Sequence, residues 1–309
     1  MARVLRVVSW NLHGAPGAPD VAGRFARVVR WILETAAATR PPDLICLQEV
    51  WTPGQEGLLR DALGERYAFV GTAGGPLLRK GGLLALVRRE GELRCAGSRF
   101  DEFVARASAW RIWEGDGLAD KGVQRLDLRC GGVPLVAFHT HLQAGYPGAG
   151  HAKTRAAQLG ELAGWMARAP ASVPALALGD LNVEPDEVES LLIARDPRWR
   201  ELSVALRARR ECWSPPDSSG REEWTDYALG RSGEAARLSL ARSDCMPSRP
   251  RDHPFSDHPG LDFDLAVEPA ARHAGSLVPV FAARLGAPQS RREWLGSLAL
   301  LVAAVALRR

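Results

Sequence analysis

A carboxylate and a carboxamide stand two residues apart, directly after a short apolar segment. Residues 175–178 read Ala-Leu-Ala-Leu, which is typical of a strand buried on both faces. Asp180 and Asn182 follow Gly179, and they would share one face if strand geometry continued through them. A carboxylate binds hard cations, and an amide can hold a phosphate oxygen or orient a water molecule. The alternative is an ordinary turn in which Asp180 only caps a helix beginning at Pro185.

Other polar residues end or flank apolar segments in the same way. They are Asn11, Glu49, His141, Asp226, Asp257 and His258. The sites of open α/β sheets lie at the carboxyl ends of strands. We therefore expect these side chains to meet Asp180 and Asn182 on a common rim.

The segments that must position these residues alternate between strand-like and helix-like patterns, which predicts an α/β fold. Strands are predicted at residues 4–10, 44–47, 67–70, 82–87, 103–113, 123–128, 133–142, 175–178, 224–229 and 261–267. Helices are predicted at residues 21–36, with Asp20 as the N-cap, at residues 153–167 and around residues 188–192. The 309 residues allow one large domain or two small ones.

The composition is that of a soluble protein with an ample core, with 46% hydrophobic and 25% charged residues. The net charge of +4 is too small to argue for nucleic-acid binding by itself. The five cysteines show no CxxC spacing, so we expect reduced thiols. The first residues lack the apolar core and cleavage site of a signal peptide, and we expect a cytoplasmic protein.

The end of the chain differs from the rest. Strand alternation stops after Glu268, so we expect a first domain over residues 1–268 and a tail over residues 269–309. Residues 294–307 form an uncharged run of 14 residues between arginine pairs. A membrane-spanning helix needs roughly 20 apolar residues. We therefore expect a packed or interfacial helix, with peripheral membrane contact as the alternative.

Six short motifs resemble those of the endonuclease/exonuclease/phosphatase superfamily, in the same order. They are Trp-Asn-Leu at residues 10–12, Leu-Gln-Glu-Val-Trp at 47–51, Thr-His-Leu at 140–142, Gly-Asp-Leu-Asn at 179–182, Asp-Tyr at 226–227 and Ser-Asp-His at 256–258. The resemblance spans residues 4–267. It implies an α/β (α+β) four-layer sandwich, with two mixed β-sheets packed face to face and flanked by helices. It also implies hydrolysis of phosphate esters with a divalent metal, Mg²⁺ first and Mn²⁺ as the alternative.

Within that superfamily the chain is most similar to the neutral sphingomyelinases. The matching pieces are residues 43–51, residues 120–122 (Asp-Lys-Gly) and residues 140–144, followed by a helix that contains Arg155 and Gln158. The resemblance implies a phosphodiesterase that acts on a phospholipid, and we expect a monomer. An endonuclease or exonuclease acting on DNA or RNA with the same metal is the second interpretation. A non-catalytic binding protein with a degenerate site is the third.

Chemistry and resemblance together assign the metal and the base. Glu49 and Asn11 would hold the metal, and Asp257 is a further candidate ligand. The metal would act as a Lewis acid on a phosphate oxygen. His258 would be the general base that takes a proton from the attacking water, and Asp226 would fix its tautomer.

The remaining candidates would act on the substrate. Asp180 would position the water or a second cation. Asn182 and His141 would donate to the charge that develops on phosphorus. Lys121 and Arg155 would contact the substrate phosphate.

Two histidine positions leave alternatives open. His139 lies on the same strand face as His141, and it is either structural or tunes the site. Asp252-His253 repeats the pair Asp257-His258 five residues earlier. We prefer the second pair because Ser256 precedes it and an alternating strand follows it.

Overall fold

The computed structural model describes residues 2–72, 74, 78–106, 119–145, 151–214, 222–246 and 255–270. The chain divides into two compact units, Met1–Ala270 and Ala271–Arg309. The apolar run at residues 294–307, with its predicted membrane contact, lies outside the described residues, as does Asp252-His253. Within the described ranges, no helix is both long and apolar enough to cross a bilayer.

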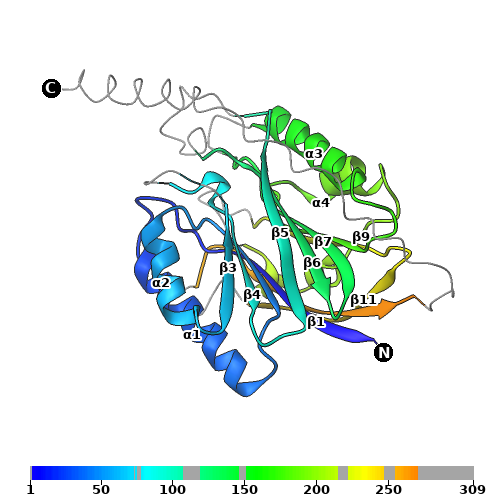
Figure 1. Ribbon diagram of the computed structural model, residues 1–309. Coiled ribbons are helices and arrows are strands. Elements are labelled where there is room, and N and C mark those ends of the chain that lie inside the picture. Colours follow the sequence, from blue (N-terminus) through cyan, green and yellow to red (C-terminus); the bar gives the residue numbers. More distant parts are fainter. Residues whose placement is uncertain are drawn as a thin grey trace, which may run out of the picture. The chain divides into compact units, whose positions relative to one another are not determined.

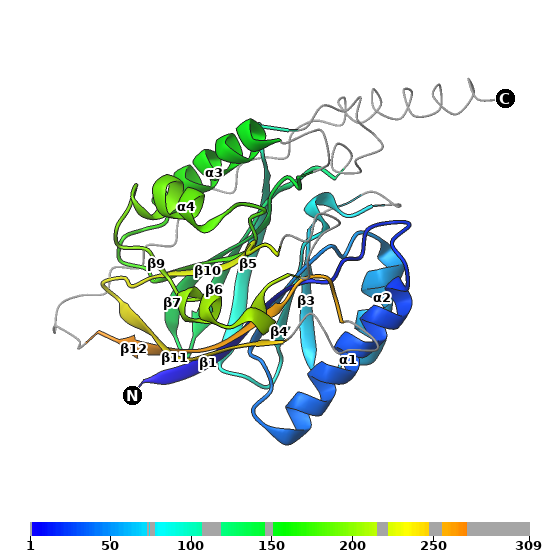
Figure 2. The ribbon, with the colours of Figure 1, turned by 180° about the vertical axis from the view of Figure 1, so that it is seen from behind.

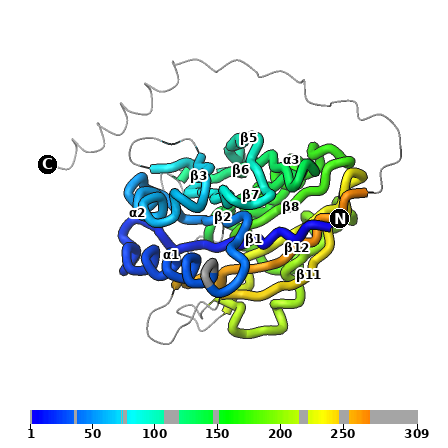
Figure 3. The backbone as a smooth tube through the Cα atoms, turned by 60° about the horizontal axis from the view of Figure 1, so that its bottom comes forward, coloured from blue at the N-terminus to red at the C-terminus, as the bar shows by residue number. Residues whose placement is uncertain are grey.

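Two six-stranded sheets form the centre of the first unit, as far as it is described. The first has the order β11-β12-β1-β2-β4-β3, with β1 (Arg3–Asn11), β2 (Leu44–Gln48), β3 (Tyr67–Gly71), β4 (Leu84–Arg88), β11 (Ala236–Met246) and β12 (Gly260–Pro269). The second has the order β5-β6-β7-β8-β10-β9, with β5 (Leu93–Glu102), β6 (Gly122–Cys130), β7 (Val133–His141), β8 (Ala175–Asp180), β9 (Arg200–Glu201) and β10 (Asp226–Arg231). Figure 3 shows β11, β12, β1 and β2 side by side. Both sheets are mixed, because β1–β2 and β7–β8 are parallel pairs and the others are antiparallel.

Helices cover the outer faces of both sheets. α1 (Val21–Ala38) and α2 (Pro53–Leu63) lie against the first sheet (Figure 1). α3 (Ala152–Ala167) and α4 (Pro185–Val188), which a π-helical turn at Glu189–Ile193 continues, lie against the second (Figure 2). The predicted four-layer sandwich is therefore confirmed.

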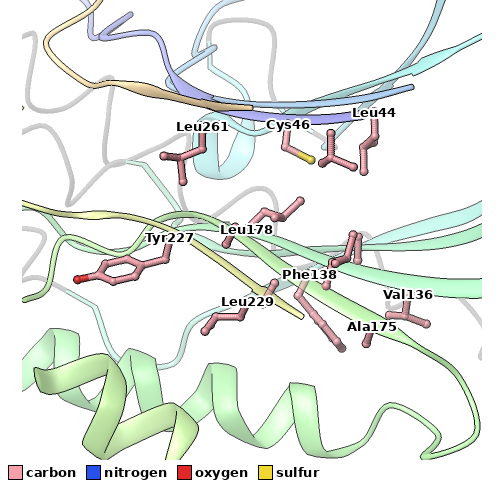
Figure 4. Close-up of a cluster of buried hydrophobic side chains, with 14 of the residues drawn as sticks. Leu44, Cys46, Val136, Phe138, Ala175, Leu178, Tyr227, Leu229 and Leu261 are labelled. Carbon is pink, nitrogen blue, oxygen red and sulfur yellow. The ribbon is translucent and has the colours of Figure 1, made fainter. Parts of the chain in front are cut away.

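Apolar side chains fill the spaces between these layers. Phe25, Val28 and Ile32 recur at helical spacing on α1 and belong to one buried cluster with strands of the first sheet. Between the sheets, Leu44 and Cys46 of the first sheet face Leu178 of the second (Figure 4). Burial of each large aliphatic or aromatic side chain of this kind stabilises the fold by roughly 2 kcal/mol.

The strand registers bring the polar strand ends together. His141 is opposite Asp180 in the parallel pair β7–β8, and Asp180 is opposite Asp226 in the antiparallel pair β8–β10. Gly179, with φ of 140°, makes this possible, because a Cβ there would lie 1.8 Å from the Thr140 carbonyl oxygen. β8 therefore continues through Gly179, beyond the predicted end of the strand.

Some element predictions are wrong or incomplete. Residues 103–106 are not a strand, and residues 107–118 lie outside the described residues; the strand of this region is β5, ten residues earlier. β5 is an edge strand with charged and exposed positions, so it carries no apolar run. α2, β9 and β11 were also not predicted. Asp20 is at the N-cap of α1, but its side chain makes no capping hydrogen bond.

The prediction of five reduced cysteines is wrong for two of them. Cys212 and Cys245 form a disulfide, with their Cα atoms 5.7 Å apart. The pair is 33 residues apart in sequence and follows no motif. Only the packing of a short 3₁₀ turn, Arg210–Cys212, beside the end of β11 brings the two sulfur atoms together. Cys46, Cys95 and Cys130 are free thiols.

Candidate active site

His258 lies between two carboxylates. Its Nδ1 is 2.7 Å from Asp226 Oδ2, and its Nε2 is 3.6 Å from Asp180 Oδ2. The backbone N–H of His258 donates to Ser256 Oγ at 3.2 Å, and that hydroxyl donates to the Asn11 carbonyl oxygen at 2.6 Å. The backbone of His258 is thus tied to the first sheet while its ring contacts the second.

These charges set the protonation of the imidazole. Burial alone would lower the pKa of His258, but Asp226, Asp180 and Asp257 outweigh it and hold the pKa well above its usual range. Burial raises the pKa of Asp180 to about 7, against the opposing charge of His258. His258 therefore carries a proton in the free protein near neutral pH, and it must lose this proton before it can act as a base.

Asn11 connects this cluster to Glu49. Its Nδ2 donates to Asp180 Oδ2 at 3.0 Å and to Glu49 Oε1 at 3.2 Å. Glu49 directly follows β2 and adopts a left-handed backbone with φ of 61°. Glu49 and His258 therefore belong to one continuous set of contacts, through Asn11 and Asp180.

The donor set fits a hard divalent cation. Glu49 Oε2 is buried and has no hydrogen-bond partner among the described residues. A buried carboxylate oxygen without a donor is costly unless a cation or water satisfies it. Asp180, Asp226 and His258 also offer one ligand atom each within 4.8 Å of one another. Carboxylate oxygens are the ligands that Mg²⁺ prefers, whereas the imidazole between them suits proton transfer.

Lys121 and His141 form the other side of the cluster. Lys121 Nζ donates to the Leu142 carbonyl oxygen at 2.6 Å and lies 3.1 Å from His141 Nε2, which is 3.6 Å from Asp180 Oδ2. An ammonium group cannot accept, so His141 Nε2 accepts and the ring proton is on Nδ1. Burial lowers the pKa of His141 well below its usual range, and the charge of Lys121 adds to this effect. His141 is therefore neutral, and in the free protein Lys121 is the donor at this position.

Comparison with models of known protein families gives a match. The sequence profile of the Endonuclease/Exonuclease/phosphatase family matches residues 8–258, which include every residue of the cluster. The chain belongs to this family. Family members are phosphoesterase hydrolases. Comparison with curated proteins gives no match.

Solved structures of the family share the fold at low sequence identity. The D. rerio TDP2 structures, a humanized form and a complex with a single-strand DNA product, superpose with TM-scores of 0.68 and 0.67 at 16% identity, covering 85% of this chain and 98% of theirs. An endonuclease/exonuclease/phosphatase from Bacteroides vulgatus gives 0.65 at 15% identity, covering 86% and 100%. SmcL gives 0.59 at 18% identity, covering 84% and 98%.

In this family member, Asp180 and Asn182 lie close together for a different reason from the predicted one. Asn182 is not in a strand: its φ is 51°, and its backbone N–H donates to Asp180 Oδ1 at 2.9 Å. Its Nδ2 donates to the Leu142 carbonyl oxygen at 3.1 Å. Same-face strand geometry is therefore the wrong reason for their proximity; a tight turn closed by Asp180 is the right one. Asp180 does not cap α4, whose N-cap is Glu184.

Two predicted site residues lie beside the cluster instead of inside it. The carboxylate of Asp257 is 3.1 Å from His13 Nδ1 and its side chain is 45% exposed, whereas no contact with Glu49 is seen in the described part. Arg155, in the first turn of α3, lies near Gly145, and its Nε and Nη1 have no hydrogen-bond partner among the described residues. The roles of Asp257 as ligand and of Arg155 as phosphate contact stay predictions.

Asn11 also has a different orientation from that of a ligand. Its Oδ1 accepts from the backbone N–H of His13 at 2.9 Å, so its amide nitrogen faces the carboxylates. The predicted metal ligation by Asn11 stays a prediction, and the contact present in the structure orients Glu49 and Asp180. His13 is a site residue that was not predicted: it follows Asn11 by two residues, and its ring contacts Asp257.

His139 is a structural residue between the sheets. Gln48 Nε2 donates to its Nε2 at 2.8 Å, and its Nδ1 donates to Gln124 Oε1 at 3.1 Å. Both partners are fully buried, as is His139 itself. Burial lowers the pKa of His139 to about 3. The ring is therefore a neutral bridge from β2 to β6, which decides between the two alternatives left open by its place in the strand.

Proposed function

We propose that this protein is a metal-dependent phosphodiesterase of the sphingomyelinase type, which hydrolyses a phospholipid head-group ester. The single observation that carries the proposal is the position of His258, whose ring lies between Asp226 and Asp180 in the same contact network as Glu49. An imidazole held by a carboxylate on one nitrogen can transfer a proton with the other.

The side chains divide the work in this proposal. His258, once deprotonated, takes a proton from the attacking water at Nε2, and Asp226 keeps the other ring nitrogen protonated and stabilises the imidazolium that forms. Asp180 orients that water, since its Oδ2 is 3.6 Å from His258 Nε2. Lys121 and Asn182 stabilise negative charge on the phosphate oxygens, whereas the neutral His141 accepts from Lys121 and orients it.

Glu49 would hold the divalent cation through its unsatisfied Oε2, with Asn11 fixing its orientation. When bound, the cation would supply Lewis-acid polarisation of a phosphate oxygen. Mg²⁺ is the first choice because the donors are oxygens, and Mn²⁺ accepts the same ligands.

The motifs at residues 43–51 and 140–144 favour a lipid substrate, and the net charge of +4 gives little electrostatic attraction for nucleic acid. One observation favours DNA instead: the similar D. rerio TDP2 was solved with a single-strand DNA product. Hydrolysis of a nucleic-acid ester is therefore the second candidate function.

A side-by-side assay tests the choice. Purified protein with Mg²⁺ is given sphingomyelin, lysophospholipid, plasmid DNA and inositol phosphates, and His258→Ala serves as the control for contaminating activity. We expect release of a phosphorylated head group by the wild type only. Rapid plasmid nicking without lipid turnover would reject the lipid proposal and support the second candidate.

A further inference from the structure

Two strained loops meet at the proposed metal site. His13, in the loop after β1, has φ of 48°, and Glu49, in the loop after β2, has φ of 61°. Non-glycine residues adopt this left-handed conformation at an energetic cost, so it persists only where neighbouring groups fix it. A group that fixes both loops would therefore control the position of the Glu49 carboxylate.

The side chain of Gln55 makes this connection. Its Oε1 accepts from the backbone N–H groups of Trp51 at 2.7 Å and of Thr52 at 3.0 Å, in the loop that follows Glu49. Its Nε2 donates to the Gly14 carbonyl oxygen at 2.6 Å, in the loop that follows Asn11. Gln55 is 8% exposed, so these bonds form largely out of contact with water.

The two loops are also in direct contact where Gln55 joins them. A Cβ on Gly14 would lie 2.1 Å from the Glu49 carbonyl oxygen, so the two backbones approach as closely as a glycine allows. A shift of Gly14 would therefore displace the backbone of Glu49. Two other backbone bonds among the described residues hold this region, Leu12 N–H to the Gln48 carbonyl oxygen at 3.1 Å and Val50 N–H to the Gly82 carbonyl oxygen at 2.9 Å, but neither reaches Gly14.

We propose that Gln55 is a positioning residue for the cation at Glu49, acting through the Gly14 and Trp51 backbones. This inference rests on the proposed function, because it assumes that Glu49 binds a divalent cation. Gln55 is also the third residue of the helix α2 capping box, in which its backbone N–H donates to Thr52 Oγ1 at 3.2 Å. The Oε1 of Gln55 belongs to the capping box as well, because the box includes its bond from the Thr52 N–H. The bond from Nε2 to Gly14 lies outside the box, so Gln55→Glu, which loses only that bond, separates loop positioning from helix capping.

The experiment measures Mn²⁺ binding directly, by electron paramagnetic resonance of the free ion, in the full chain without substrate. Gln55→Met keeps the side-chain length but loses all three carboxamide bonds, and Gln55→Glu keeps the two acceptor bonds but loses the donor to Gly14. Thr52→Ala is the matched control, because it removes the side-chain half of the cap on the same helix turn and leaves the carboxamide and its three bonds in place. Thermal unfolding of each variant reports the structural effect.

We expect Gln55→Met to raise the Mn²⁺ dissociation constant by roughly 10- to 100-fold, the usual effect of losing an outer partner of a metal ligand. Thr52→Ala should lower the thermal midpoint but bind Mn²⁺ like the wild type. Gln55→Glu should also bind more weakly, although added negative charge alone would strengthen binding. If folded Gln55→Met and Gln55→Glu both bind like the wild type, this inference fails and the proposed function stands. If the wild type itself binds no Mn²⁺, both fail.

Discussion

His139, the neutral histidine between the sheets, allows a quantitative prediction of how the free energy of unfolding depends on pH. The folded protein binds a proton at His139 only below a pKa of about 3, against an ordinary value of 6.5. The unfolded chain therefore binds more protons in this interval, and the free energy of unfolding falls as the pH falls below 6.5. The physical reason is burial, because a protonated ring would be charged and out of contact with water; its second proton would also face the amide NH2 of Gln48, itself a donor 2.8 Å away.

Between pH 7.5 and pH 5 this linkage removes about 2 kcal/mol, since each pKa unit corresponds to about 1.4 kcal/mol. The assay is urea unfolding at both pH values for the wild type and for His139→Gln, which keeps a polar side chain but cannot titrate. Other groups contribute equally to both proteins, so the difference between the two pH dependences isolates His139. Equal losses in the two proteins would refute the reasoning.

Three further predictions concern activity. His258→Ala should lose roughly 10²- to 10⁴-fold in kcat and keep the thermal midpoint of the wild type; an active, folded variant would remove His258 as the base. Asp226→Asn should move the acid limb of the kcat/KM profile to lower pH, because the carboxylate raises the pKa of His258, and an unmoved limb would contradict that coupling. Glu49→Gln should raise the Mg²⁺ concentration required for half-maximal rate, so an unchanged metal titration would count against its ligand role.

The positions of the main site residues could be predicted because each of them ends or begins a recognisable strand. Asp180 and His141 follow apolar runs, and parallel pairing places such ends at one edge of the sheet. The order of the motifs along the chain was therefore enough to predict which residues meet at the site, namely Glu49, Asn11, Asp180 and His258.

Side-chain direction could not be predicted in the same way. Asn11 turns its amide nitrogen to the carboxylates because its oxygen accepts from His13, a bond that depends on the left-handed backbone of that residue. Lys121 reaches His141 only because β6 and β7 pair in one particular register. Such contacts depend on loop geometry and register, which residue spacing alone leaves undetermined.

The disulfide between Cys212 and Cys245 affects how Asp226 and His258, the pair proposed to transfer the proton, are brought together. Cys212 precedes the segment that leads to Asp226, and Cys245 precedes the one that leads to His258. The covalent bond therefore joins the starts of the two chain segments that precede Asp226 and His258. Closing a loop of 33 residues lowers the entropy of the unfolded chain, which stabilises the fold by roughly 3–4 kcal/mol. Because cystine forms only where an electron acceptor takes up two electrons from the thiols, the chain needs oxidative maturation to reach this form. Protein produced in a reducing cell would have to be oxidised before the disulfide joins the segments that precede Asp226 and His258.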